Sequence, residues 1–250
     1  MGSKPSHHAI TAREGARPEG RDRERSLRLK TARRLPAGAM TDTADEKALI
    51  HCGWGRLIFA DTFPDSPSLV DTLLEEAPGE RDIAFYATSP HVALSLAPQQ
   101  VFLDPSHTYR LWLADYRASR RRPMGFFVRR LRNRSDAEAV NRIYAKANMV
   151  QVPTDFLLNN VSSRRLTYLV AEDETSGEIV GTVTGIDHYR AYNDPQRGAS
   201  LWCLAAEPQA SHPGVGETLV RQLAEHYLAR GRAFLDLSVM HDNEAAIALY

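Results

Sequence analysis

The feature that most constrains the fold of this chain is a glycine-bearing loop between a strand and an amphipathic helix. Residues 200–206 (Ser-Leu-Trp-Cys-Leu-Ala-Ala) have the composition of a buried strand, and the segment 207–217 that follows contains two glycines close to a helix start. Glycine lets a backbone approach an anion closely, and the free N–H groups at a helix N-terminus attract negative charge. The segment therefore predicts a phosphate-binding loop. The apolar face of the following helix is formed by Val215, Leu219, Leu223 and Tyr227.

Two common phosphate-binding motifs are excluded at this loop. The third glycine of a dinucleotide-binding motif is missing, and no Gly-Lys-Ser/Thr follows that would hold a nucleoside triphosphate. A Gly-x-Gly before a helix is often only a tight turn, so the order of the neighbouring elements has to decide.

That order is regular over the second half of the chain. Ser135 is a candidate helix cap, with Glu138 completing a capping box. Gly231 is a helix stop, and Asn243 caps a last helix. The expected elements are a strand at 125–129, helices from 135 and at 154–160, strands at 167–172 and 179–186, a polar loop at 189–198, the strand 200–206, a helix at 216–230, a strand at 233–239 and a helix from 243.

The stretch 125–250 resembles the GNAT acetyltransferases. Asn-x-x-Ala-x-x-Leu-Tyr at 243–250, at a fixed distance from the glycine loop, carries most of this resemblance. It implies an α/β (α+β) fold of the acyl-CoA N-acyltransferase type, in which helices flank a mixed sheet. It also implies an acetyl-CoA-dependent N-acetyltransferase that acts on a small amine.

The resemblance places acetyl-CoA where the strands 200–206 and 233–239 separate. Asn243 matches a family position on the thiol side of the cofactor, and Tyr250 matches the general acid that protonates the leaving thiolate. For the general base, His188 is preferred on its intrinsic pKa over Asp187 or a water relayed by Glu207. The expected cofactor contacts are Leu204, Ala205 and Ala206 for the pantetheine arm, and Ser211, His212, Pro213, Gly214, Val215, Gly216 and Glu217 for the diphosphate.

The sequence departs from the family pattern in two ways. Ser211 stands where the family usually has Gln or Arg, so we expect weaker cofactor binding but not its loss. The family domain also continues past the position of Tyr250 with two more strands. We therefore expect a domain that is incomplete at its C-terminus, with an unpaired sheet edge.

Residues 46–120 are expected to form a small α/β segment of unknown role, and 121–250 the GNAT domain. The runs 53–60, 82–86 and 102–117 resemble the N-terminal half of bacterial N-acetylglutaminylglutamine synthetases, which join a GNAT domain to an ATP-grasp ligase. This implies the α-amine of glutamine or of a glutamine dipeptide as acceptor in osmoprotectant synthesis, and an ATP-grasp domain downstream. The alternatives are an acetyltransferase of other amine or protein specificity, and a non-catalytic acetyl-CoA sensor.

Residues 1–45 are expected to be a disordered basic leader, with Met40 as a candidate true start. Residues 1–40 hold ten Lys or Arg against four acidic residues and few large apolar ones. A nucleic-acid-binding role would rest on this leader and on the run 120–134, which is more simply a solvated boundary, so no nucleic-acid partner is expected. No membrane partner is expected either, since no apolar run approaches the roughly 20 residues of a membrane span. Two distant cysteines without metal-ligand spacing indicate a cytoplasmic protein without a metal site.

Overall fold

The computed structural model describes residues 45–119, 123–207 and 212–250. The expected leader thus lies outside the described residues except for Asp45, and Ser211 lies outside them too. The elements are β1 (Leu49–His51), β2 (Arg56–Phe59), η1 (Ala60–Thr62), α2 (Ser66–Leu73), β3 (Ile83–Phe85), α3 (Pro90–Leu96), β4 (Ser106–Trp112), β5 (Phe126–Arg130), α4 (Arg134–Lys146), α5 (Thr154–Asn159), β6 (Leu166–Asp173), β7 (Ile179–Asp187), α6 (His188–Tyr192), β8 (Ala199–Ala206), α7 (Val215–Ala229), β9 (Phe234–Met240) and α8 (Glu244–Leu249).

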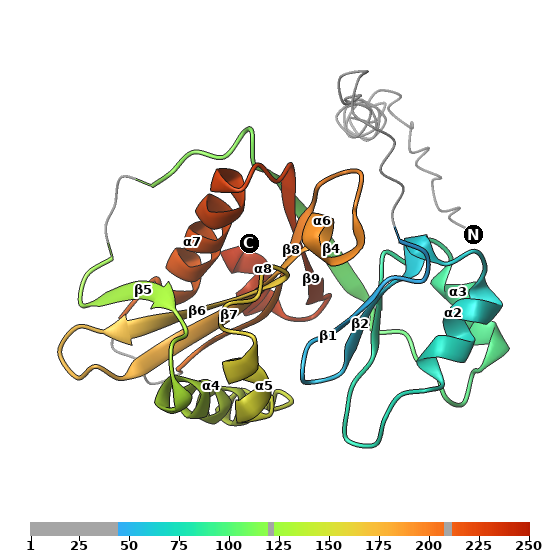
Figure 1. Ribbon diagram of the computed structural model, residues 1–250, viewed down its shortest axis with the longest axis horizontal. Coiled ribbons are helices and arrows are strands. Elements are labelled where there is room, and N and C mark those ends of the chain that lie inside the picture. The colour runs from blue at the N-terminus through green and yellow to red at the C-terminus, as the bar shows by residue number, and fades with distance from the viewer. Residues whose placement is uncertain (1–44, 120–122, 208–211) are drawn as a thin grey trace, which may run out of the picture. The chain divides into compact units, whose positions relative to one another are not determined.

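Six of these strands form one mixed sheet in the order β4-β9-β8-β7-β6-β5 (Figure 1). Neighbouring strands pair antiparallel except β8 and β9, which run parallel. The predicted class, a mixed sheet flanked by helices, is confirmed. The parallel pair is the one that the glycine loop and α7 connect, as a strand–helix–strand crossover requires.

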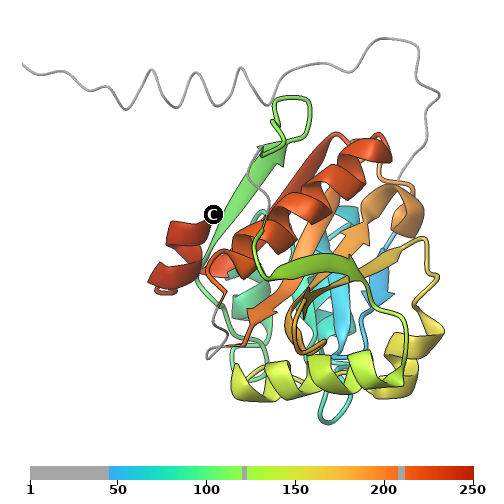
Figure 2. The same cartoon turned by 90° about the vertical axis from the view of Figure 1, so that its left-hand side faces the viewer.

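Helices cover both faces of this sheet, because successive side chains of a strand point to opposite faces. α4 and α7 lie on opposite faces (Figure 2), and each face has its own buried cluster. Leu219, Leu223 and Tyr227 of α7 pack on one face against Leu201 of β8 and Leu235 of β9. The α4 side chains that pack on the other face are Ala137, Ala139, Val140, Ile143 and Tyr144.

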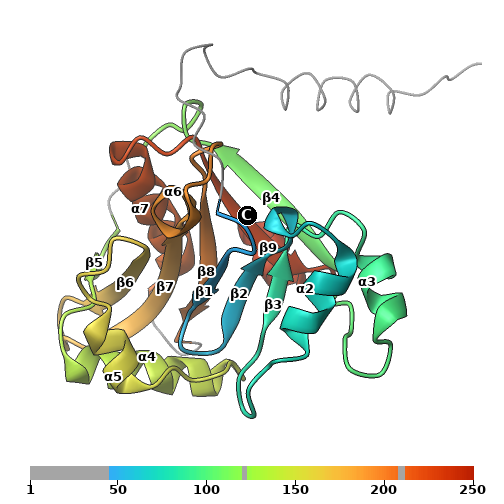
Figure 3. The same cartoon turned by 45° about the vertical axis from the view of Figure 1, so that its right-hand side comes forward.

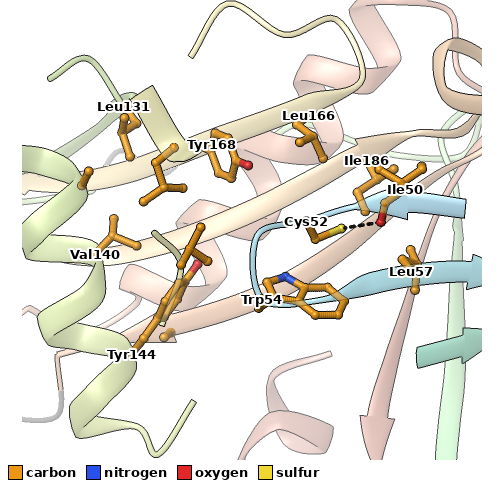
Figure 4. Packing of buried hydrophobic residues seen from close by; sticks show 14 of the residues in the cluster. Ile50, Cys52, Trp54, Leu57, Leu131, Val140, Tyr144, Leu166, Tyr168 and Ile186 are labelled. Atoms are coloured by element: carbon orange, nitrogen blue, oxygen red, sulfur yellow. Dashed lines mark hydrogen bonds between the residues drawn. The ribbon is translucent and has the colours of Figure 1, made fainter. Parts of the chain in front are cut away.

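The first half of the chain forms a small sheet of its own, β1-β2-β3, beside α2 and α3 (Figure 3). Its β1–β2 hairpin packs directly against the α5 region. Gly53, at φ +84°, has no room for a side chain, since a Cβ there would lie 2.5 Å from Val152 and 2.6 Å from Phe156. Figure 4 shows Cys52 and Trp54 of this hairpin in the same cluster as Tyr144 of α4. Segment 46–120 therefore shares a hydrophobic core with 121–250.

The same segment also completes the large sheet. β4 pairs antiparallel with β9 from Ser106↔Met240 to Trp112↔Phe234. The expectation of an unpaired edge beside β9 is therefore wrong, because a strand from the first half of the chain occupies that edge. The proposed boundary near residue 120 stays a prediction. The pairing of β4 with β9 crosses this boundary.

Two local predictions need correction. α4 is capped by Asn133, whose side chain accepts a hydrogen bond from the backbone N–H of Asp136, and not by Ser135, whose hydroxyl donates to Asn133. The helix thus starts two residues earlier than the capping box indicated. The expected loop after β7 opens with the short helix α6, capped by the Asp187 carboxylate. None of the helices in the described part of the chain has the length and apolarity that a membrane crossing requires.

Candidate functional site

The site is built around a fork between β8 and β9. Their pairing covers only Ala199↔Leu235, Ser200↔Asp236 and Leu201↔Leu237. β8 continues to Ala206 while β9 continues to Met240, so the two strands separate beyond these three positions. Parallel strands that part in this way leave backbone N–H and C=O groups without a ladder partner. This confirms that the strands diverge where the sequence indicated.

A β-bulge lies at the base of the fork. On β7, Thr182 pairs with Ala205 and Thr184 with Trp202, so two residues of β8 lie opposite a single residue of β7. The first of them, Cys203, has φ +51°, which is uncommon outside glycine. Bulges re-aim backbone groups, and backbone strain of this kind is concentrated at functional sites. No sequence pattern predicted the bulge.

The glycine loop ends in a conformation that only glycine adopts without strain. Gly214 is the N-cap of α7 at φ +85°, and a Cβ built there meets no atom of the described residues within 4 Å. A ligand can therefore reach the backbone at this point. Its carbonyl accepts the first helical bond from Thr218, and within the described residues no backbone partner is found for the N–H groups of Val215, Gly216 and Glu217, which can therefore face an anion.

Small residues bring the loop onto the sheet. A Cβ on Gly181 of β7 would lie 2.5 Å from Val215, and one on Gly216 would lie 3.2 Å from Leu249 of α8. The start of α7 is thus wedged between β7 and α8. A glycine inside a strand often marks such a close approach, so Gly181 was a signal that the sequence reasoning could have used.

Two of the predicted diphosphate contacts, Pro213 and Glu217, have no other described role or a purely local one. Pro213 lies exposed in the turn before the helix. Glu217 is exposed and forms an i,i+4 ion pair with Arg221, at 2.8 Å between Oε1 and Nε. Among the predicted pantetheine contacts, Ala205 is buried and Ala206 is exposed at the end of β8. Leu204 packs partly buried against the α7 cluster.

His212 is held by the β6–β7 turn. Its Nε2 bonds to an Asp173 carboxylate oxygen, and the other oxygen of that carboxylate accepts from the backbone N–H groups of Thr175 and Ser176. These bonds, with the backbone N–H of Ser176 first and His212 second, hold the pKa of Asp173 well below its usual range. A Cβ on Gly125 would lie only 2.6 Å from Cε1 of the His212 ring, so the imidazole packs directly against this glycine. The C-terminal end of the loop is therefore anchored to the sheet.

A polar pocket of about 370 Å³ opens beside this anchor. One wall is the exposed face of α4, where Lys146 Nζ donates to both oxygens of Glu207 at 2.9 Å. The lining residues are Ala139, Arg142, Ile143, Lys146, Asp173, Ser176, Glu178, Ile179, Val180, Glu207 and His212.

Asn243 and Tyr250 flank α8. The Asn243 side chain accepts from the backbone N–H of Ala246 at 3.1 Å, which confirms it as the helix cap. Tyr250 packs partly buried against the α7-side cluster, with its ring centroid 6.4 Å from that of Tyr109 of β4. Burial raises the pKa of Tyr250 to about 12, so its hydroxyl keeps its proton at neutral pH. A proton donor at this position is therefore available.

His188, the predicted base, has no exposed surface. Its side chain is completely buried, Nε2 hydrogen-bonds Ser200 Oγ at 2.8 Å, and Nδ1 lies 3.8 Å from an Asp194 oxygen. Burial lowers its pKa to about 3, with the charge of Arg110 as the second cause. The hydrophobic environment that removes it from solvent also removes its basicity, so we do not retain His188 as the base. Asp187, the other candidate, is equally buried, and its Oδ1 is 2.8 Å from Arg232 Nε.

One buried network at the fork was not predicted. Asp236 of β9 accepts two hydrogen bonds from Arg110 of β4, at 2.8 and 2.7 Å, and a third from the Tyr86 hydroxyl at 2.6 Å. Asp236 pairs with Ser200, one register position before the fork opens. These contacts join residues far apart in sequence, so no local pattern could reveal them.

The comparisons with known proteins agree with this geometry. The family model described as "Acetyltransferase (GNAT) family" matches residues 128–250. An acetyltransferase of Pectobacterium atrosepticum is 30% identical over 126 residues, which are 48% of this chain and 82% of that relative. The chain belongs to the GNAT acetyltransferase family. The predicted enzyme class, an acetyltransferase, agrees with this membership.

Other matches are shorter or more distant. An acetyltransferase of Sodalis glossinidius is 35% identical over 83 residues, and this match spans 33% of the chain and 52%, about half, of that relative. A solved Drosophila protein matches with a TM-score of 0.50 and 16% identity, covering 78% of this chain and 64% of that one, which shows the fold alone. The family match begins at Val128, so it does not address the role of residues 46–120.

Proposed function

We propose that this GNAT protein is an acetyl-CoA-dependent N-acetyltransferase of a small primary amine. The observations that support it most are the fork between β8 and β9 and the glycine N-cap of α7, the helix that follows β8 in the chain. The open space at Gly214 and the free N–H groups behind it fit a diphosphate. The backbone of Leu204 to Ala206 fits an extended arm that adds to the edge of β8 as a strand does.

Acetyl-CoA would supply an acetyl group activated as a thioester. The residues of the chain would stabilise the charge that develops and hold the proton for the leaving group. Backbone N–H groups at the bulge, around Leu204, would face the negative charge that develops on the acetyl oxygen. The Tyr250 hydroxyl would hold the proton that the leaving sulfur takes up. A cytoplasmic location stays a prediction.

Glutamine, or a glutamine dipeptide, is the acceptor that we propose to test first. Its support is the resemblance of runs 53–60, 82–86 and 102–117 to the N-terminal half of N-acetylglutaminylglutamine synthetases. This proposal also implies an ATP-grasp domain in the same protein. The structure adds that two of these runs contain β2 and β3, which share the core cluster of α4 with the fork residue Trp202.

The test has two stages. Isothermal titration calorimetry of the chain with acetyl-CoA should show one site, and with CoA a similar one, because the contacts are to the shared diphosphate and pantetheine. A thiol-release assay should then show turnover with L-glutamine that depends on both substrates. Absence of acetyl-CoA binding to the folded chain would refute the proposed function, whereas binding with turnover of another amine would refute only the acceptor.

A regulatory acetyl-CoA sensor is the second candidate. It is favoured by one observation, the burial of His188, which leaves the fork without the base that the sequence indicated. A sensor would bind acetyl-CoA with no thiol release for any amine, even at alkaline pH, where the amine needs no base.

A further inference from the structure

We propose that the indole of Trp202 is the specificity-determining wall of the acceptor site, held in place by the small N-terminal sheet, and that it selects amines that carry one positive charge and no second cationic group. This inference rests on the proposed function. It assigns a role to residues 46–120, for which neither the sequence nor the family match provides one.

One face of the fork is already filled. Leu204, Ala246, Ile247 and Tyr250 pack against the cluster beneath α7. An acceptor therefore has to approach the bulge from the opposite face. Trp202 lies on that face, as the last residue of β8 before the bulge, and it remains partly exposed.

The N-terminal sheet surrounds Trp202 with aromatic rings. The Phe85 ring, at the end of β3, meets it edge-on with centroids 5.2 Å apart, and the Trp54 ring from the β1–β2 hairpin lies 6.2 Å away. Tyr86 stacks on Phe85 at 4.0 Å. Such ring pairs contribute beyond the area they bury and restrict the rotation of each ring. The position of the indole is thus determined by a segment outside the family match.

The indole N–H is fixed from the sheet side as well. Trp202 Nε1 donates to Ser200 Oγ at 2.7 Å, and the same oxygen bonds His188 Nε2 at 2.8 Å. A serine hydroxyl that accepts from the indole can donate to an unprotonated Nε2, and this leaves the Nδ1–H of His188 facing Asp194. His188 is therefore a positioning residue that acts through Ser200 on Trp202.

The chemistry of this wall limits the acceptor. An aromatic surface excludes water, and loss of water lowers the pKa of an amine, so a docked ammonium gives up its proton more readily. The acidic side chain joined to the cluster, Asp236, already binds Arg110 and Tyr86 and is fully buried. It cannot pair with a second positive charge on the acceptor. Polyamines and aminoglycosides are disfavoured for this reason, and amines with only one positive charge are favoured.

The test compares acceptor selectivity in Trp202→Phe with that in the unsubstituted chain. The probes are L-glutamine, L-leucine amide and spermidine, each at saturating acetyl-CoA, with kcat/KM from thiol release. The unsubstituted chain should prefer L-glutamine and L-leucine amide, each with one positive charge, to spermidine. In Trp202→Phe the ratio of kcat/KM between L-glutamine and L-leucine amide should change about tenfold, the size that a reshaped apolar pocket produces. The KM for acetyl-CoA should change less than about twofold, since the proposed cofactor contacts are backbone groups of β8 and of the loop before α7.

Trp112→Phe is the matched control. Trp112 also packs edge-on against a ring, that of Phe234, with centroids 5.6 Å apart. It is the last residue of β4 and pairs with Phe234 at the start of β9, away from the fork. The control should keep the selectivity of the unsubstituted chain. Ser200→Ala should shift selectivity in the same direction as Trp202→Phe, and Ser200→Thr, which keeps a hydroxyl, should restore it.

The outcomes are distinguishable. Unchanged selectivity in a folded, active Trp202→Phe, or an effect confined to the KM for acetyl-CoA, overturns this inference and leaves the proposed function intact. Binding of acetyl-CoA without thiol release for any of the three amines overturns both. If Trp202→Phe fails to fold, Phe85→Leu removes the neighbouring ring without altering β8, and the same change in selectivity is then required.

Discussion

Arg110 and Asp236 join the two halves of the chain through a bidentate contact. The guanidinium of Arg110 on β4 donates from Nε and Nη2 to the two carboxylate oxygens of Asp236 on β9, at 2.8 and 2.7 Å. Asp236 is completely buried, and the guanidinium also lies 3.6 Å from the centroid of the Phe234 ring. The segment that precedes the family match is thereby bound to the strand that forms one arm of the fork.

Asp236→Asn should therefore destabilise the protein strongly. It leaves Arg110 charged and incompletely paired, and loss of one partner of a buried pair costs about 3 kcal/mol or more. Urea unfolding followed by circular dichroism measures this. The control is Asp155→Asn, because the Asp155–Arg134 pair is exposed, at 77% and 60% of the side chains, and should contribute less than about 1 kcal/mol. Equal effects of the two substitutions would contradict the role given to the Arg110–Asp236 contact.

Gly214→Trp should abolish acetyl-CoA binding in calorimetry. The indole would occupy the open space over the first turn of α7, where the diphosphate has to lie. Gly79→Trp is a matched control, since Gly79 has nearly the same φ, +84° against +85°, and equally open surroundings. Both should lose about 1–2 kcal/mol of stability from the left-handed backbone, but only Gly214→Trp should lose binding. Unchanged affinity in Gly214→Trp would refute the loop assignment.

Tyr250→Phe should lower kcat about a hundredfold at pH 7, the size expected for loss of a general acid. The KM for acetyl-CoA should stay nearly constant, because the ring and its packing are kept. Since burial raises the pKa of Tyr250 to about 12, the unsubstituted enzyme should show no loss of activity from Tyr250 ionisation up to about pH 10. Tyr109→Phe is the control, and a similar fall in its kcat would argue for a packing effect.

Stability should decline as the pH falls below about 6.5. The unfolded chain binds a proton at His188 below its ordinary pKa of about 6.5, whereas burial lowers the pKa of His188 in the folded protein to about 3. The contribution is thus complete above pH 6.5 and is lost between 6.5 and 3. His188→Gln, which keeps a partner for Ser200 but cannot titrate, should flatten urea stabilities measured from pH 7.5 to 4.5. His226→Gln, at a half-exposed histidine whose pKa burial lowers to about 4, should flatten them less.

A chain that begins at residue 123 should fail to fold as a monomer. The shortened chain would lack β4, so the edge of β9 would be open. It would also lack Trp54 and Phe85, the rings that cover Trp202. Size-exclusion chromatography and thermal melts should show aggregation or a large loss of stability. The comparison is a chain that begins at Asp45, which keeps every described contact. A cooperative, monomeric 123–250 would instead support a domain boundary near residue 120.

Local patterns were sufficient for most of the elements. The cap at Asn243 agrees with the expectation, and Gly231 lies in the left-handed region just past the end of α7, as a helix stop does. These features depend on turns and caps, whose physics acts over a few residues. The cap of α4 shows the limit. Asn133 and Ser135 are both good caps, and the path of the preceding strand decided between them.

What the sequence by itself determined was the family, the glycine loop and the helix motif from Asn243 to Tyr250, because each is a short pattern with its own conformational requirement. What only the tertiary structure decided was the environment of single side chains. His188 follows a strand, just before the expected polar loop, yet it is completely buried, and the rings of Phe59, Tyr86 and Tyr192 pack around it. β4, Trp54 and Phe85 reach the fork across more than a hundred residues. Burial and charge pairing result from such long-range packing, and a local sequence pattern carries no information about which distant segment will supply it.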